Sequence, residues 1–105
     1  MTDTGNLAPT ARLAIDEAIE ECIVSRRNFY LGLWAGRQLD LPEEALRAYA
    51  ETVVEADHEE PGHDDVIRKI ARDFAERGQS MTRAEILRQL IRTHLLAARQ
   101  FGMSD

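Results

Sequence analysis

Seven side chains that could bind a metal ion or transfer protons lie within nine residues in the middle of the sequence. They are Asp57, His58, Glu59, Glu60, His63, Asp64 and Asp65. Imidazole nitrogens and carboxylate oxygens form a mixed ligand set that suits zinc and similar divalent metals. The same residue types can act as a general acid and a general base. The stretch therefore poses three alternatives: a metal site, an acid–base site, or the corner between two helices.

Helix-end chemistry accounts for most of these carboxylates. Residues 61–62, Pro-Gly, favour a turn, which places Asp64 and Asp65 in the first turn of a following helix. Acids at that position complement the positive end of the helix dipole. Each acid also precedes a base by four residues, which predicts the ion pairs Asp64–Arg68 and Asp65–Lys69. The stretch is therefore predicted to be a corner between two helices.

The other candidates for metal binding or covalent catalysis have unsuitable surroundings. His58 and His63 lie on opposite sides of the turn, so they do not share the i, i+4 face of a zinc-binding helix. Ser25 and Ser80 lack a Gly-x-Ser-x-Gly setting. Cys22 falls on the face of the first helix that we expect to be buried, where a thiol is normally inert. We therefore expect no metal, no cofactor and no catalytic residue.

Composition and charge narrow the class of protein. The 105 residues are 44% hydrophobic and 30% charged, which is typical of one soluble globular domain. The net charge of −6 argues against a nucleic-acid partner, because such binding depends on neutralising phosphates. The single cysteine excludes an internal disulfide. The longest uncharged run in the middle, residues 28–36, is shorter than the ~20 residues that span a bilayer. We expect a cytoplasmic protein without direct membrane insertion.

Hydrophobic periodicity predicts four helices and no strand. The first and longest runs from about Thr10 to Leu39, and the second starts near Pro42 and stops at 59–62. The third starts near His63 and ends before Gly78. The fold class is therefore all-α, a compact four-helix bundle with a long first helix. Residues 1–9 are expected to form a flexible lead-in to a single domain at 10–105.

The fourth helix has the clearest local start signal. Thr82 and Glu85 have the spacing of a capping box, and Met81 and Ile86 that of a hydrophobic staple. Its apolar positions, predicted to face the core, are Leu87, Leu90, Ile91, His94, Leu95 and Phe101.

The first helix carries a long apolar stripe interrupted by two arginines. The stripe, predicted to be buried, includes Leu13, Ile15, Ile19, Cys22, Ile23, Phe29, Leu33 and Trp34. Gly32 and Gly36 lie four residues apart on one face, a spacing that would let another helix approach closely. Arg26 and Arg27 either extend to solvent or contact an anion, and spacing alone leaves both alternatives open.

Three blocks of sequence together resemble a known family. "RRNFYLGLWA" (26–35), "AYAETVVEAD" (48–57) and "EEPGHDDVIRKI" (59–70) resemble the zeta-subunit family of alphaproteobacterial ATPase inhibitors, over about 25–100. The resemblance implies a four-helix bundle that binds the catalytic head of the F-type ATP synthase. It also implies inhibition of ATP hydrolysis by an inserted N-terminal segment, weak binding of ADP or ATP, and a location peripheral to the inner membrane.

The residues that match the family motifs are interpreted as fold-defining. They are Asn28, Gly32, Trp34, Tyr49, Asp57, Glu59, Glu60, Pro61 and Gly62. The N-terminal segment departs from the family pattern, because residues 1–20 contain no aromatic side chain and Arg12 is their only base. The candidate contacts to the partner within it are Leu7, Arg12, Leu13, Ile15 and Asp16.

The leading hypothesis is a non-enzymatic regulatory subunit that restrains ATP hydrolysis and is monomeric when free. An alternative is a zeta paralogue that binds or senses adenine nucleotides, with Arg26, Arg27 and Lys69 as candidate phosphate contacts. A third option is a hydrolase that uses acids of the 59–65 segment as acid and base.

Overall fold

Four α-helices make up most of the residues that the computed structural model describes, 9–58 and 63–102. The helices are α1 (Pro9–Gln38), α2 (Glu43–Glu55), α3 (Asp64–Glu76) and α4 (Arg83–Gly102), and a short 3-10 helix, η2 (Ala56–His58), follows α2. The predicted all-α class and the long first helix are confirmed. Gly78, with φ of 73°, follows α3 in the left-handed conformation expected of a residue just beyond a helix end.

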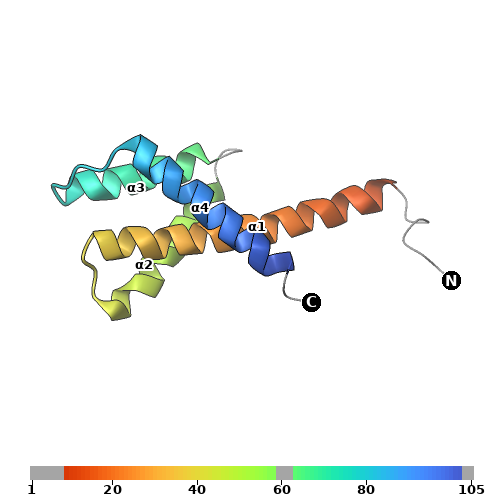
Figure 1. Ribbon diagram of the computed structural model, residues 1–105, viewed down its shortest axis with the longest axis horizontal. Helices are drawn as coiled ribbons and strands as arrows, with labels where there is room; N and C mark the ends of the chain where they lie inside the picture. The colour runs from red at the N-terminus through yellow and green to blue at the C-terminus, as the bar shows by residue number, and fades with distance from the viewer. Residues whose placement is uncertain (1–8, 59–62, 103–105) are drawn as a thin grey trace.

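All four helices contribute to one hydrophobic core. Figure 1 shows α2 beside the C-terminal half of α1, with α3 and α4 packed on the bundle and α4 crossing α1. Trp34 of α1 packs against the core and its ring lies 6.2 Å from that of Phe74 in α3. The largest side chains that are fully buried are Leu31, Val53, Val66, Ile67, Ile70, Phe74 and Ile86.

Gly32 allows α1 and α2 to pack backbone against backbone, and Gly36 leaves room for the side chain of Leu46. A Cβ atom at Gly32 would lie 2.6 Å from the Cα of Ala50, and one at Gly36 would lie 2.8 Å from Cδ2 of Leu46. Real Cβ atoms do not approach other atoms so closely. The close helix approach predicted from the four-residue spacing of these glycines is therefore confirmed.

The N-terminal half of α1 extends beyond the bundle (Figure 1). The Cα radius of gyration is 16.3 Å, whereas a compact chain of this length has about 13 Å. Residues 12–22 are all exposed, and we call this segment the arm. The expectation that Cys22 is buried was wrong, as it was for Leu13, Ile15 and Ile19. The reason is length: 30 residues of α1 span about 45 Å, and 13 residues of α2 span only about 20 Å.

Fewer residues of α4 are buried than its apolar periodicity predicts. Ile86, Leu90 and Ala97 are buried, whereas Ile91 and Leu95 are 51% and 63% exposed. Phe101 is also exposed, so the predicted core positions of α4 were correct only in part. Ile91 and Leu95 are four residues apart on a different face from the buried set, and that face remains open to solvent.

The capping box at the start of α4 is one-sided. The backbone N–H of Glu85 donates to Oγ1 of Thr82 at 3.1 Å, as the spacing predicted. The carboxylate of Glu85 instead pairs with Arg88 and accepts a hydrogen bond from Gln89. Met81 packs against the core, which agrees with its predicted role in a hydrophobic staple.

We predict that Gly32→Ala destabilises the fold although alanine is the better helix former. The new methyl group would meet the backbone of Ala50, so α1 and α2 must separate. Overpacking costs about 1–3 kcal/mol, and improved helix propensity returns up to about 1 kcal/mol. Urea unfolding should therefore give a free energy of unfolding lower by about 1–2 kcal/mol.

The matched control for this substitution is Gly102→Ala. A Cβ atom at Gly102 would meet no atom of the described part of the chain within 4 Å, so this variant should unfold close to the wild-type midpoint. Equal stability of both variants would contradict the close helix approach.

Candidate functional site

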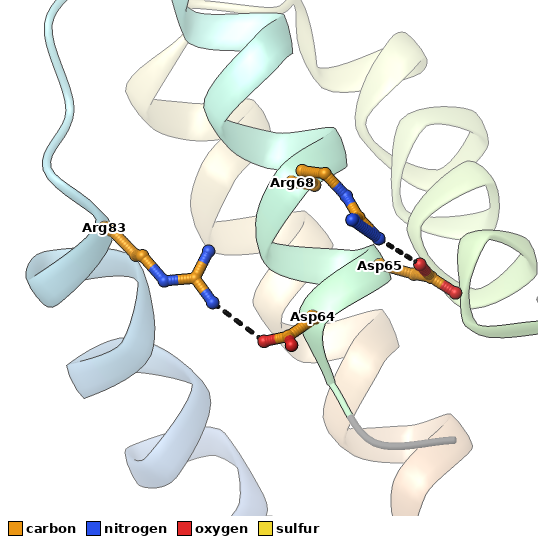
Figure 2. A network of polar contacts seen from close by, with 4 residues as sticks. All are labelled: Asp64, Asp65, Arg68 and Arg83. Carbon is orange, nitrogen blue, oxygen red and sulfur yellow. Dashed lines mark hydrogen bonds and ion pairs between the residues drawn. The ribbon is translucent and has the colours of Figure 1, made fainter. Parts of the chain in front are cut away.

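The two acids at the start of α3 both form ion pairs, one to α4 and one within α3. Figure 2 shows Asp64 paired with Arg83 of α4, and Asp65 paired with Arg68 one turn along α3. The distance from Arg83 Nη2 to Asp64 Oδ1 is 2.7 Å. Both acids do lie in the first helical turn, as predicted. The predicted partners were wrong: Asp64 is bonded to α4, and Asp65 pairs with the base three residues away instead of four.

Lys69, the predicted partner of Asp65, belongs to a contact between α2 and α3. Its ammonium group lies 2.9 Å from Oδ2 of Asp73 and 5.2 Å from the centre of the Tyr49 ring. The Tyr49 hydroxyl donates a hydrogen bond to the same Asp73 oxygen at 2.7 Å. Burial raises the pKa of Tyr49, and the hydrogen bond to Asp73 and the charge of that carboxylate raise it further. The three side chains tie the two helices together.

Four residues of the ligand-rich stretch, 59–62, lie outside the described residues. His63 precedes α3 and is half-buried, and Asp57 lies in η2. Among residues 9–58 and 63–102, no three histidine, cysteine, aspartate or glutamate side chains meet in a metal-binding arrangement. The described part of the stretch is thus a helix corner whose Asp64 and Asp65 carboxylates are occupied in ion pairs.

The residues predicted to contact a partner lie on the arm, apart from Leu7, which is outside the described residues. Arg12, Leu13, Ile15 and Asp16 are all exposed. Helical geometry separates them, because Leu13 points away from the face that carries Ile15.

Sequence reasoning missed Ile19 as a surface residue of the arm. It shares the face of Ile15 at i+4, with Cys22 next along that face, and it is 37% exposed. Its place in the apolar stripe was noted, but the stripe was assigned to the core.

The three predicted phosphate contacts lie in three different environments. Lys69 pairs with Asp73, as described. Arg27 is only 6% exposed, and its Nε donates to Oδ1 of Asn28 at 2.9 Å. Burial lowers the pKa of Arg27, and the nearby charges of Asp57 and Glu20 oppose that shift. Arg26, in contrast, is exposed.

Arg26 lines an open groove of about 1120 Å³ between α1 and α2, which we call the aromatic groove. Phe29 and Tyr30 form part of its wall, and the guanidinium of Arg47 lies 6.0 Å from the centre of the Phe29 ring. Arg47 was not among the predicted site residues. The contact between Arg47 and Phe29 depends on how α2 packs on α1, so the sequence alone did not indicate it.

Comparison with known proteins identifies the family. The model of the family described as ATPase inhibitor subunit zeta matches residues 3–100. The chain belongs to this family. No curated protein and no solved structure matches it. The match starts before the blocks that suggested the resemblance and includes the arm, and a family of ATPase inhibitors is regulatory in character.

Several family-motif residues of this zeta-family chain lie at helix contacts. Gly32 makes the closest approach to α2, Trp34 packs against Phe74, and Tyr49 bonds to Asp73. Asn28 is buried beside Arg27. Over the described part of the chain, no helix has the length and apolar character needed to cross a membrane.

The raised pKa of Tyr49 predicts a loss of stability at alkaline pH. In the unfolded chain a tyrosine releases its proton near pH ~10. The folded protein holds this proton to higher pH, so above that pH the unfolded state binds fewer protons than the folded one. The free energy of unfolding therefore falls as the pH rises above about 10. Urea unfolding between pH 9 and 11 should show this decline.

Tyr49→Phe should make the alkaline decline shallower. It should also lower stability at neutral pH by about 1 kcal/mol, because the hydrogen bond to Asp73 is lost. Tyr30→Phe, which removes the hydroxyl bond to Gln100, serves as the control for loss of a tyrosine hydroxyl. An unchanged pH dependence in Tyr49→Phe would contradict the assignment.

Proposed function

We propose that this chain is a regulatory subunit that binds the catalytic head of the F-type ATP synthase and restrains ATP hydrolysis through its N-terminal segment. Membership of the ATPase inhibitor subunit zeta family supports an inhibitory role. On this proposal the free protein is monomeric and cytoplasmic, and it is peripheral to the inner membrane when bound to the enzyme.

The observation that carries the proposal is the exposed, amphipathic arm. Ile15 and Ile19 are 47% and 37% exposed on one face, with Cys22 continuing that face. Asp16, Glu17 and Glu20 lie outside this apolar stripe. Apolar anchors spaced at i, i+4 and i+7 are the usual means by which a helix binds in a hydrophobic groove of a partner. These features support the proposal that the arm binds in a hydrophobic groove of the enzyme.

The first test compares ATP hydrolysis by the cognate enzyme in the presence of full-length and truncated protein. Deletion of residues 1–20 should abolish inhibition, because it removes most of the arm. Ile15→Ser with Ile19→Ser should raise the concentration needed for half-inhibition by roughly 10- to 100-fold, since interface anchors are worth over ~1 kcal/mol each.

The control is Leu95→Ser, which removes from α4 an apolar side chain that is more exposed than Ile15 or Ile19. The deletion and both sets of substitutions remove no buried side chain of the described part of the chain, so all three variants should fold. Inhibition that survives deletion of the arm, or that Leu95→Ser weakens as much as the double change, would contradict the proposal.

The aromatic groove supports a second candidate function, binding of an adenine nucleotide. Phe29 and Tyr30 offer ring faces on which a base could stack, and Arg26 and Arg47 offer guanidinium donors for phosphate oxygens. The alternative phosphate contacts Arg27 and Lys69 do not line this groove and are bonded to Asn28 and Asp73. Arg47 also has a partner, Glu51 at 3.8 Å, but that exposed ion pair is weak enough to be exchanged for a phosphate.

Titration with ADP, followed by amide chemical shifts, tests this candidate. The expected result is a cluster of shifts around Arg26, Phe29 and Arg47, and Arg47→Gln should weaken binding by roughly tenfold. The control is Arg92→Gln, which removes an exposed arginine of α4 and should leave binding unchanged. Shifts scattered over the whole surface, or an equal effect of both substitutions, would argue against a nucleotide site here.

A further inference from the structure

The face of α1 that meets the core continues beyond the bundle as an acidic face. Within the bundle this face carries Asn28, Leu31, Ala35 and Leu39, all buried and three or four residues apart. The same steps toward the N-terminus keep the helix face constant. The residues reached in this way are Val24, Glu21, Glu20 and Glu17.

These acids line a groove where the bundle ends, between α1 and the end of α2 with η2. Glu17, Glu20, Glu21 and Asp57 lie along it, and Val54 and Asn28 form part of its wall. We call it the acidic groove. Its volume is about 680 Å³, within the 300–1,000 Å³ that is usual for binding pockets. The groove is therefore large enough for a ligand of several functional groups.

Asn28 gives the groove an unmet hydrogen-bonding requirement. The residue is 1% exposed, and its Oδ1 accepts the bond from Arg27. Its Nδ2 is buried and has no hydrogen-bond partner among residues 9–58 and 63–102. Buried amide groups are nearly always hydrogen-bonded, because an unpaired donor loses its bonds to water without replacement. Because Asn28 lines the acidic groove, a ligand that brought an acceptor to Nδ2 would satisfy this donor.

The excess of carboxylates along the groove also favours a ligand that carries positive charge. Four carboxylates line the groove, and the guanidinium of Arg27 interacts with two of them, Asp57 and Glu20. Arg26 and Arg47 line the neighbouring aromatic groove, which shares Glu21 but also carries Glu51 and Glu55. A metal ion would leave Nδ2 unpaired, because the lone pair of an amide nitrogen is delocalised into the carbonyl, so that nitrogen donates hydrogen bonds and does not ligate metals. A polyamine also offers donors only. A polypeptide with lysine or arginine side chains supplies both cations and backbone carbonyl acceptors.

We propose that the acidic groove binds a basic peptide segment of a partner protein. Its lysine or arginine side chains pair with Glu17, Glu20, Glu21 and Asp57, and one of its backbone carbonyls accepts a hydrogen bond from Asn28 Nδ2. The groove lies on the face of the arm away from Ile15 and Ile19. It is thus a second binding surface, beyond the proposed inhibitory one, and both could be occupied at once.

The test uses the full-length protein and two probes, the peptide acetyl-Ala-Arg-Ala-Arg-Ala-amide and spermidine. With the peptide, backbone shifts should cluster at Val24, Asn28, Val54 and Asp57, and the side-chain amide protons of Asn28 should move downfield. Spermidine should shift the acidic positions but leave the Asn28 side-chain amide in place. An identical Asn28 response to both probes would overturn the peptide assignment.

Paired charge substitutions supply the second arm of the experiment. Glu17→Gln with Glu20→Gln should weaken peptide binding by roughly fivefold, the scale of two exposed ion pairs. Glu43→Gln with Glu44→Gln, which removes the same charge from the first turn of α2, should leave binding unchanged. Equal weakening by both pairs would show non-specific attraction and overturn the site.

Absence of any saturable shift up to about 10 mM peptide would overturn it as well. No ATP synthase is present in these measurements. Failure here therefore leaves the inhibition assay unaffected, and failure of that assay does not bear on this groove.

Discussion

The backbone contact between α1 and α2 determines where every other feature of the molecule lies. With no side chain at Gly32, the Cα of Ala50 can lie 2.6 Å from the position that a Cβ atom would take, closer than a real Cβ would allow. This contact holds α2 against the C-terminal half of α1. Since α2 has only 13 residues, it leaves the N-terminal half uncovered, and the arm and both grooves follow from that arrangement.

Polar side chains then fix the remaining helices on this pair. Tyr49, Asp73 and Lys69 tie α2 to α3, and Asp64 with Arg83 ties α3 to α4. Such contacts give less stability than the hydrophobic core, because partly exposed ion pairs are worth little. They do select one arrangement of helices that could otherwise slide along their apolar faces. Acids that first suggested chemistry therefore serve mainly to position helices in the described part of the chain.

The sequence predicted what depends on neighbours along the chain. Most helix bounds came within one or two residues, but α2 ends at Glu55, several residues before the predicted stop at 59–62. The spacing of Gly32 and Gly36 correctly indicated a close approach. The burial of Ile15, Ile19 and Cys22 was predicted wrongly, because apolar periodicity cannot tell whether a second helix is long enough to cover the stripe. The ion partners of Asp64 and the contact of Arg47 with Phe29 were missed for a related reason. Both depend on distances between helices, which no local pattern contains.

The continuity of α1 has one more consequence. The helix runs from Pro9 to Gln38 without a break, so the arm and the core segment share one axis and one angular phase. A partner that holds the apolar side of the arm would therefore also determine the direction in which the whole bundle projects from it. Each residue turns a helix by about 100°, so the number of residues between Ile19 and Asn28 sets this orientation. Because α1 is one continuous helix, a partner bound to the arm would fix the orientation of the bundle as well.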